Sequence, residues 1–384
     1  MKQRIRVIAA VLVVVLLLPL VCAASGGSAE VSGMGDLACK SAILMDAETG
    51  EVLYEQNADE ALPPASVTKV MTLLLVMEAI DEGRVSLSDM VRVSANAASM
   101  GGSQVFLEEG EEMCVEEMLK CVIIASANDC AVALAEYVSG SEEGFVAAMN
   151  ARAAELGMKN THFENTNGLD DTAQNHVTSA RDIAIMSRAL IAYPKILEYS
   201  GIWMDTIRDG AFGLTNTNRL VRFYPGCTGL KTGSTARAGF CVSATAKREG
   251  LSLICVIMGA PSRDARNTAA AKLLDFGFAH YETYRAPGGE CILPAQGSDT
   301  DSLRVTWPAV CVTVPKGKAT RVNVSRELPE CVQAPLQAGD CVGEVVYSLD
   351  GEEIARVSAC GEAALDEIGF GSLFRRLLSK FLLL

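Results

Sequence analysis

The segment from Val70 to Met77 is almost wholly apolar, and it constrains the fold of this chain more than any other stretch. A helix that is hydrophobic on every side is stable only when other elements cover every side. Ser66 and Lys69 stand directly before it, at a spacing that places hydroxyl and amine on one helical face. A lysine buried there tends to lose its proton and can act as a base. The pattern predicts a nucleophile with its own activator or, in the simpler interpretation, a serine that caps the helix.

The N-terminus combines basic residues, an apolar run and a small-residue cleavage site. This order is typical of a secretory signal peptide, so we expect residues 1–23 to be one, with cleavage after Ala23 or Ala24. Residues 24–35 then form a flexible, Gly/Ser-rich lead. An uncleaved membrane anchor is the alternative, although the apolar run is short for a span. A lipoprotein through Cys22 is less favoured, because a bulky residue precedes it.

The net charge of −14 argues against nucleic acid as a partner. Thirteen cysteines are unusual for an exported protein, but they form no C-x-x-C pair and no Cys/His cluster of metal type, so we expect no metal and no cofactor. Disulfides are one interpretation of the cysteines. Free thiols that behave as small hydrophobes are the other, and it is favoured by the cysteines that lie in apolar stretches. These are Cys121, Cys130, Cys241 and Cys255.

Strand-like segments before and after a helical block predict one large domain. Residues 42–54 and 240–259 each have the pattern of a β-hairpin with a glycine in the turn. Residues 116–190 follow mainly helical spacing, and residues 266–278 predict a further helix. We therefore expect an α+β domain over residues 36–283, in which an antiparallel sheet joins distant parts of the sequence.

The remainder of the chain differs in composition. Residues 287–360 contain short β-type runs separated by Pro, Gly and Asp, which predicts a small all-β domain. Residues 366–384 predict an amphipathic helix, too short and too charged to span a membrane but suited to an anionic membrane surface. Packing on the β domain or on a partner is the alternative. With the signal peptide, this helix predicts a protein held peripherally at the outer face of the cytoplasmic membrane.

Two further motifs follow Ser66. Ser126-Ala127-Asn128 lies within the helical block, and Lys231-Thr232-Gly233 lies just before the second hairpin. S-x-x-K, then S-x-N, then K-T-G is the motif set of penicillin-binding proteins and serine β-lactamases. Each motif alone is a weak signal. All three in this order, in an exported chain, favour the nucleophile over the helix cap.

The chemistry of acyl transfer suggests a role for each residue of the first two motifs. Ser66 would attack, and Lys69 would take its proton. Asn128 can hold Lys69 or the substrate amide through its fixed donor and acceptor, and Ser126 can relay a proton to the leaving amine. The backbone N–H of Ser66, near a helix N-terminus, is a natural donor to the oxyanion.

The third motif predicts substrate binding. Lys231 would place a positive charge in the cavity, and Thr232 would offer a hydroxyl to a substrate carboxylate. Gly233 would let a substrate backbone approach the strand closely.

Beyond these motifs the chain resembles the low-molecular-mass D-alanyl-D-alanine carboxypeptidases of the penicillin-binding protein 5 type, peptidase family S11, over nearly everything after the signal peptide. The resemblance rests on Ala61 to Lys69, on Phe163 to Leu169, which is similar to the family's F-x-N-x-x-G-L stretch, and on Lys231 to Phe240. It implies a serine β-lactamase/DD-peptidase-like domain followed by the small β domain and the terminal helix. It also implies that Arg266, rather than nearby Arg263, binds the terminal carboxylate of the substrate.

The resemblance further implies an activity. The enzyme would remove the terminal D-alanine from peptidoglycan stem pentapeptides through an acyl-enzyme on Ser66, and β-lactams would inhibit it. A serine β-lactamase and a peptidoglycan-binding homologue without turnover are the alternatives. Glu164 does not stand in the E-x-x-L-N context of a class A β-lactamase, and His176 is interpreted as a structural or surface residue. Ser234 stands where some relatives have a histidine, which leaves the pH profile and substrate preference open.

Overall fold

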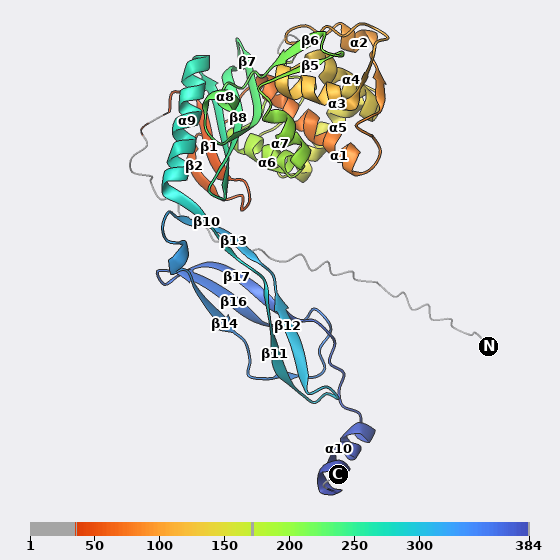
Figure 1. Ribbon diagram of the computed structural model, residues 1–384, viewed down its shortest axis with the longest axis vertical. Helices are drawn as coiled ribbons and strands as arrows, with labels where there is room; N and C mark the ends of the chain where they lie inside the picture. The colour runs from red at the N-terminus through yellow and green to blue at the C-terminus, as the bar shows by residue number, and fades with distance from the viewer. Residues whose placement is uncertain (1–34, 36, 170–172, 383–384) are drawn as a thin grey trace, which may run out of the picture. The chain divides into compact units, whose positions relative to one another are not determined.

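The computed structural model of the chain describes residue 35, residues 37–169 and residues 173–382 (Figure 1). The predicted signal peptide, residues 1–23, lies outside the described residues, as does the predicted lead except for its last residue. The described part of the chain stops at Leu169, where the F-x-N-x-x-G-L stretch ends, and resumes at Ala173.

A five-stranded antiparallel sheet joins the two predicted hairpins. Its strand order is β2-β1-β9-β8-β7, so the first hairpin of the chain pairs with strands that lie far away in sequence. The turn between β8 and β9 places Glu249 and Gly250 at positive φ, which suits a tight two-residue turn. Both hairpin predictions are confirmed. The strands are β1 (Ser41–Asp46), β2 (Val52–Gln56), β7 (Cys227–Thr235), β8 (Gly239–Arg248) and β9 (Leu251–Ala260).

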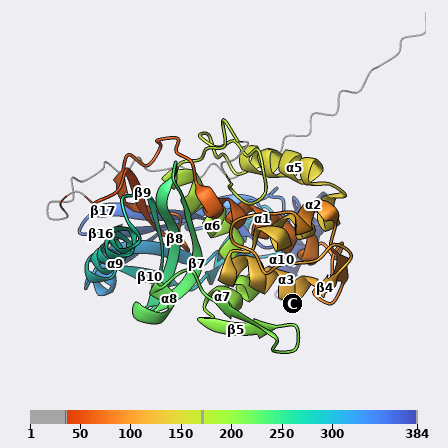
Figure 2. The ribbon, with the colours of Figure 1, turned by 90° about the horizontal axis from the view of Figure 1, so that it is seen from above.

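Helices cover both faces of this sheet. Helix α9 contacts β8 and β9 on one face, and α6 contacts β1 and β9 on the other, with α1 beyond α6 (Figure 2). The helical segments are η1 (Ala65–Thr68), α1 (Lys69–Asp81), α2 (Ala95–Ala98), α3 (Val115–Lys120), η2 (Cys121–Ala125), α4 (Asn128–Ser139), α5 (Glu142–Glu155), α6 (Ala180–Ile191), α7 (Pro194–Ser200), α8 (Leu220–Phe223) and α9 (Arg263–His280). Two small antiparallel sheets of two strands lie among them, formed by β3 (Met90–Arg92) with β4 (Glu112–Cys114) and by β5 (Met204–Ile207) with β6 (Phe212–Thr215).

Helix α1 is the centre of the helical block. Seven of the eight residues from Val70 to Met77 are buried, and helices α4, α5 and α6 contact it. A helix with apolar residues all round has no face to turn to water, so neighbours must cover it. The prediction from the apolar run is confirmed, and this burial encloses Lys69 at the first position of the helix.

The residues after α9 are almost entirely β-structure. Six strands form one sheet in the order β14-β16-β17-β12-β11-β15, and β10 pairs with β13. The core of this region contains Val305, Tyr347 and Ala359. The strands are β10 (Tyr281–Ala286), β11 (Gly289–Gln296), β12 (Ser302–Trp307), β13 (Val310–Pro315), β14 (Asn323–Glu327), β15 (Val332–Gln333), β16 (Cys341–Leu349) and β17 (Glu352–Gly361), with the short helix η3 (Ala319–Arg321) before β14.

Helix α10 (Phe370–Leu382) follows this sheet, within the range predicted for an amphipathic helix. Its apolar side chains between Phe370 and Phe381 are exposed, most of all these two at 84% and 90%. Within the described residues, every helix is too short or too polar to cross a membrane.

Candidate active site

Ser66 lies inside the tight helical turn η1, directly before α1. The position that caps this turn is Pro64, which makes no side-chain capping bond, so the interpretation of Ser66 as a helix cap is wrong. Ser66 is only half-buried, whereas its neighbours Ala65 and Val67 are buried. The turn therefore presents one hydroxyl from an otherwise enclosed segment.

Lys69 is fully buried behind Ser66, and its amine contacts three oxygen atoms. Nζ lies 3.0 Å from Ser66 Oγ, 2.5 Å from Asn128 Oδ1 and 2.9 Å from the Asn167 carbonyl oxygen. The amide and backbone oxygens can only accept hydrogen bonds, whereas a serine hydroxyl can donate or accept. A neutral amine has two hydrogens and one lone pair. When the two carbonyl oxygens take both hydrogens, the lone pair is left for the Ser66 hydroxyl, as a general base requires.

The surroundings of Lys69 favour this neutral form. Burial is the main reason why the pKa of Lys69 lies well below its ordinary value, and the positive charge of Lys231 lowers that pKa further. The carboxylate of Asp129 acts in the opposite direction. On balance the pKa of Lys69 is lowered, which favours the neutral amine over the cation.

Asn128 is the first residue of α4, and its amide is held from two sides. Its backbone N–H donates to the Ser103 carbonyl oxygen at 2.7 Å, and its Nδ2 donates to the Gly101 carbonyl oxygen at 2.7 Å. Because Nδ2 is held there, Oδ1 faces Lys69. The structure thus brings the first two motifs into contact.

Ser126 lies at a break in the helical block. The π-helical segment η2 ends there, and Ser126 adopts the left-handed conformation with φ 64° before α4 begins at Asn128. This conformation is uncommon for a residue with a side chain, and π-turns frequently occur at functional sites. The side chain of Ser126 is buried. The helical spacing of the sequence does not indicate this break.

Strand β7 carries the third motif past the nucleophile. A Cβ added to Gly233 would lie 2.8 Å from the Ser66 backbone nitrogen and 2.8 Å from the Pro64 carbonyl oxygen, so only glycine allows this approach. Thr232 Oγ1 donates to Thr217 Oγ1 at 2.8 Å. The predicted role of Gly233 concerned a substrate backbone, whereas the approach seen here is to the nucleophile turn itself.

Lys231 is fully buried on the same strand, and its Nζ donates to the Thr232 carbonyl oxygen at 2.9 Å. Burial, with the nearby charge of Arg266, lowers the pKa of Lys231 to about 7. Lys231 therefore keeps its positive charge only at low pH or beside an anion.

Arg266 lies on α9 with its guanidinium buried against β8. Its Nη1 donates to the Cys241 carbonyl oxygen at 3.4 Å, and Cys241 pairs directly with Gly233 of β7. Arg263 is exposed at the start of the same helix. The burial distinguishes the two arginines and sets Arg266 beside the third motif. Burial and the charge of Arg263 lower the pKa of Arg266 to about 10.

A segment described over residues 161–169 and 173–178 contains contacts that the sequence did not indicate. The Asn167 backbone oxygen holds Lys69, and the Thr166 backbone oxygen accepts from Thr72 Oγ1 at 2.6 Å, so the segment follows one face of α1. Within the segment, Gly168 lies so close to Ala65 that an added Cβ would be 1.9 Å from the Ala65 carbonyl oxygen. The F-x-N-x-x-G-L stretch was the available signal for this segment.

His176 is buried in the same segment, so it is not a surface residue. Its Nδ1 accepts from the Glu164 backbone N–H at 3.0 Å, which places the hydrogen of a neutral ring on Nε2. Nε2 lies 2.7 Å from Thr68 Oγ1, and Thr68 Oγ1 donates to the Ala65 carbonyl oxygen at 2.8 Å. His176 thereby ties the segment to the turn that carries Ser66.

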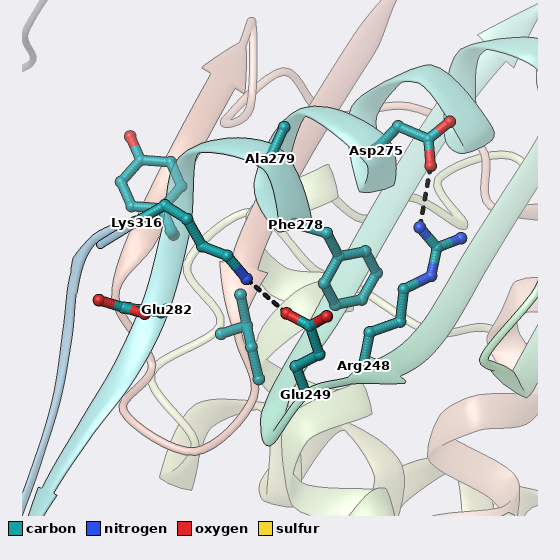
Figure 3. A pocket seen from close by; sticks show the side chains of 9 residues that line it. Arg248, Glu249, Asp275, Phe278, Ala279, Glu282 and Lys316 are labelled. Atoms are coloured by element: carbon teal, nitrogen blue, oxygen red, sulfur yellow. Dashed lines mark hydrogen bonds and ion pairs between the residues drawn. The ribbon is translucent and has the colours of Figure 1, made fainter. Parts of the chain in front are cut away.

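A separate pocket of about 370 Å³ contains none of these residues (Figure 3). Two ion pairs line it, Arg248 with Asp275 and Lys316 with Glu249, and Phe278 lies between them. The remaining charged group of the pocket, Glu282, accepts from the Ala319 backbone N–H at 2.8 Å. The three motifs lie at the site around Ser66 and not in this pocket.

A half-buried serine hydroxyl beside a buried lysine amine is an arrangement suited to acyl transfer. The family described as D-alanyl-D-alanine carboxypeptidase, peptidase S11, matches residues 28–262, and the C-terminal domain of penicillin-binding protein 5 matches residues 299–364. The chain belongs to this D-alanyl-D-alanine carboxypeptidase family.

Relatives match over most of the chain. The D-alanyl-D-alanine carboxypeptidase DacF of Bacillus subtilis is 43% identical over 350 residues, which are 89% of this chain and 90% of DacF. DacC of Escherichia coli is 35% identical over 88% of this chain and 87% of its own length. The crystal structure of penicillin-binding protein 5 from Haemophilus influenzae superimposes with a TM-score of 0.79 and 33% identity, covering 87% of this chain and 99% of that one. The α+β fold and the family resemblance are confirmed.

Proposed function

We propose that this protein is a serine-type D-Ala-D-Ala carboxypeptidase that removes the terminal D-alanine from peptidoglycan stem pentapeptides. The observation that carries the proposal is the buried Lys69 amine, 3.0 Å from the Ser66 hydroxyl and held by two carbonyl oxygens. The names of the relatives support the substrate class.

The reaction proceeds in two steps. Ser66 Oγ attacks the carbonyl carbon of the penultimate D-alanine while its proton passes to Lys69 Nζ. The peptide C–N bond then breaks, the leaving amine takes a proton through Ser126, and an ester remains on Ser66. Water then attacks the carbonyl carbon of this ester. The bond to Ser66 Oγ breaks, Oγ regains a proton, and the shortened peptide leaves with a free carboxyl group. The Ser66 backbone N–H, beside Gly233, donates to the oxyanion.

The carboxylate of the leaving D-alanine distinguishes this substrate from an internal peptide. Lys231 and Arg266 supply positive charge around the third motif, and Thr232 supplies a hydroxyl. An anion between two cations also offsets the cost of burying them. A carboxypeptidase therefore suits this site better than an endopeptidase.

β-Lactams would acylate the same serine. Structures of the related penicillin-binding protein D2 from Listeria monocytogenes, 33% identical over 63% of this chain with a TM-score of 0.58, are described in an ampicillin-bound form. Cell wall remodelling and inhibition by penicillin would both proceed through an acyl-enzyme on Ser66.

Release of D-alanine from a diacylated Lys-D-Ala-D-Ala peptide tests the proposal, with Ser66→Ala as the inactive control. We expect the unaltered chain to release D-alanine and the variant to release none. No release by the unaltered chain contradicts the proposal and favours a homologue that binds without turnover. The lifetime of the penicillin adduct separates the other alternative, because a β-lactamase would lose the adduct within seconds, whereas a carboxypeptidase keeps it for many minutes.

We propose further that the protein is exported and works outside the cytoplasmic membrane. The basic start, the apolar run and the cleavage site before Ser25 support this. N-terminal sequencing of the protein from its own cells should begin after Ala23 or Ala24. A mature protein that begins at Met1 contradicts the signal peptide.

Helix α10 would hold the exported protein at the membrane surface. Its exposed apolar side chains and the basic Arg375 and Arg376 support the proposal. The signal-cleaved chain should sediment with vesicles of anionic lipid, and deletion of residues 370–384 from it should abolish this. A Phe370→Ser/Phe381→Ser double variant should weaken it strongly, whereas Ser379→Ala on the polar side should not. Unchanged binding after the deletion contradicts the proposal.

A further inference from the structure

Two cysteines face each other across neighbouring strands of the six-stranded sheet. Cys341 begins β16 and Cys360 lies near the end of β17, and the two are direct partners in the antiparallel register. Their Sγ atoms lie 3.9 Å apart. Among the described residues no cysteine forms a disulfide, so both sulfurs of this pair remain available for one.

The backbone at this pair has the geometry of a cross-strand disulfide. The Gly361 N–H donates to the Asp340 carbonyl oxygen, so the ladder bond lies one residue beyond the cysteines. Cys341 and Cys360 therefore occupy a non-hydrogen-bonded position, where opposed Cα atoms lie about 4.5 Å apart and the side chains are closest. This separation lies within the range of about 4.4–6.8 Å that disulfides span.

Access distinguishes this pair from the other close pair of thiols. Cys341 is exposed and Cys360 is half-buried, so a reagent can reach the first sulfur and the second can follow. Cys121 and Cys130 are neighbours as well, but both are fully buried in the helical block. Burial raises the pKa of Cys130 well above its ordinary value, and burial with the neighbouring Cys341 also raises the pKa of Cys360. The exposure of Cys341 to reagents is therefore what distinguishes the Cys341–Cys360 pair.

We propose that Cys341 and Cys360 form a modification site that reacts with disulfide oxidants and closes to a cross-strand disulfide. The Cys341 thiolate attacks one sulfur of the oxidant, forms a mixed disulfide and releases one thiolate. The Cys360 thiolate then attacks Cys341 Sγ, forms the Cys341–Cys360 bond and releases the second thiolate. Two protein thiols lose two electrons and two protons, and the oxidant disulfide is reduced to two thiols.

The position of the bond predicts its effect. Cys360 lies on β17, and the next residue, Gly361, pairs with Val305 of β12. The bond would therefore tie β16 to β17 at the place where β17 also pairs with β12. The cross-link would restrict the unfolded chain between residues 341 and 360 and thereby stabilise the β region. It lies outside the residues assigned to catalysis, so it should leave D-alanine release unchanged.

Oxidised glutathione tests the proposal on the full chain. The chain is incubated with it at pH 8, the remaining thiols are alkylated, and the protein is digested without reduction. A single linked pair of peptides containing Cys341 and Cys360 is expected, with alkylation of the other accessible thiols. The thermal midpoint of the oxidised protein should rise by several degrees, and that rise should disappear on reduction.

Matched variants locate the chemistry. Cys360→Ser should leave a stable mixed glutathione disulfide on Cys341, whereas Cys331→Ser, which removes a half-buried thiol of the same region, should leave the cross-link intact. Recovery of Cys341 and Cys360 as alkylated thiols from the oxidised unaltered chain, or cross-linking of either one to a different cysteine, overturns the proposal. The peptide map of the unaltered chain decides the question even if a variant fails to fold.

Discussion

Lys69 shows how one side chain joins stability to chemistry. A cation enclosed by apolar residues is costly, so burial favours the neutral amine, and the neutral amine is the form that accepts a proton from Ser66. The two carbonyl oxygens of Asn128 and Asn167 then determine where the lone pair points. The residue that is least favourable for folding is thereby the one best prepared for reaction.

Lys231 should set the alkaline limit of activity. Its pKa of about 7 in the free enzyme means that it loses its positive charge as the pH rises above neutrality, and a substrate carboxylate then binds more weakly. We expect kcat/KM for the D-Ala-D-Ala peptide to fall above pH 7. Lys231→Arg keeps a charge at all these pH values and should move the fall upward by about one pH unit or more. Half-buried Lys195, which pairs with Glu198, offers Lys195→Arg as the control. A fall at the same pH in Lys231→Arg and in the unaltered chain contradicts the assignment.

The contact between β7 and the nucleophile turn depends on the absence of a side chain. Gly233→Ala would place a methyl group against the backbone of Pro64 and Ser66, and displacement of the reacting serine by about 1 Å costs roughly 100-fold in rate. We expect a loss of that order in the rate of acylation by penicillin. Gly213→Ala, where nothing lies within 4 Å of the new methyl group, is the control. Equal rates in the two variants contradict the close contact.

The hydrogen bond between His176 and Thr68 should help to hold Ser66 in position for reaction. Thr68→Val and His176→Leu should each slow acylation by about tenfold, and the double variant should be hardly slower than either, because both changes break one connection. His176→Gln, which retains a donor toward Thr68, should recover part of the rate. A role in stability alone would lower the thermal midpoint of each variant and leave acylation at low temperature unchanged.

The elements differ in how far the sequence could predict them. Helix α1 and the hairpins of β1–β2 and β8–β9 depend on local apolar patterns and turn residues, and they were predicted. The order of the three motifs identified the residues around Ser66 because each motif is a short, local signal. The left-handed Ser126 and the contact of His176 with Thr68 were not predicted, because the first depends on packing and the second joins residues 108 positions apart.

For the protein as a whole, the enclosed cations should make stability depend on pH. The pKa of Lys231 is about 7 in the folded chain and near 10.5 when unfolded, so the unfolded state binds more protons between these values and the free energy of unfolding rises with pH there. The contribution is on the order of 5 kcal/mol. Lys231→Met should raise stability at pH 7 and below and remove this part of the rise. Denaturant unfolding from pH 6 to 10 measures it, and parallel curves for the variant and the unaltered chain contradict it.

The central claim is that Ser66 is the nucleophile and Lys69 its base, and penicillin tests both with one measurement. Intact mass and peptide mapping after brief exposure should show a single penicilloyl group on the peptide that contains Ser66. Ser66→Ala should gain no mass, and Lys69→Met, which fills the same space without an amine, should acylate at least about 100-fold more slowly. An adduct on Ser66→Ala, or acylation of Lys69→Met at the rate of the unaltered chain, would contradict the claim.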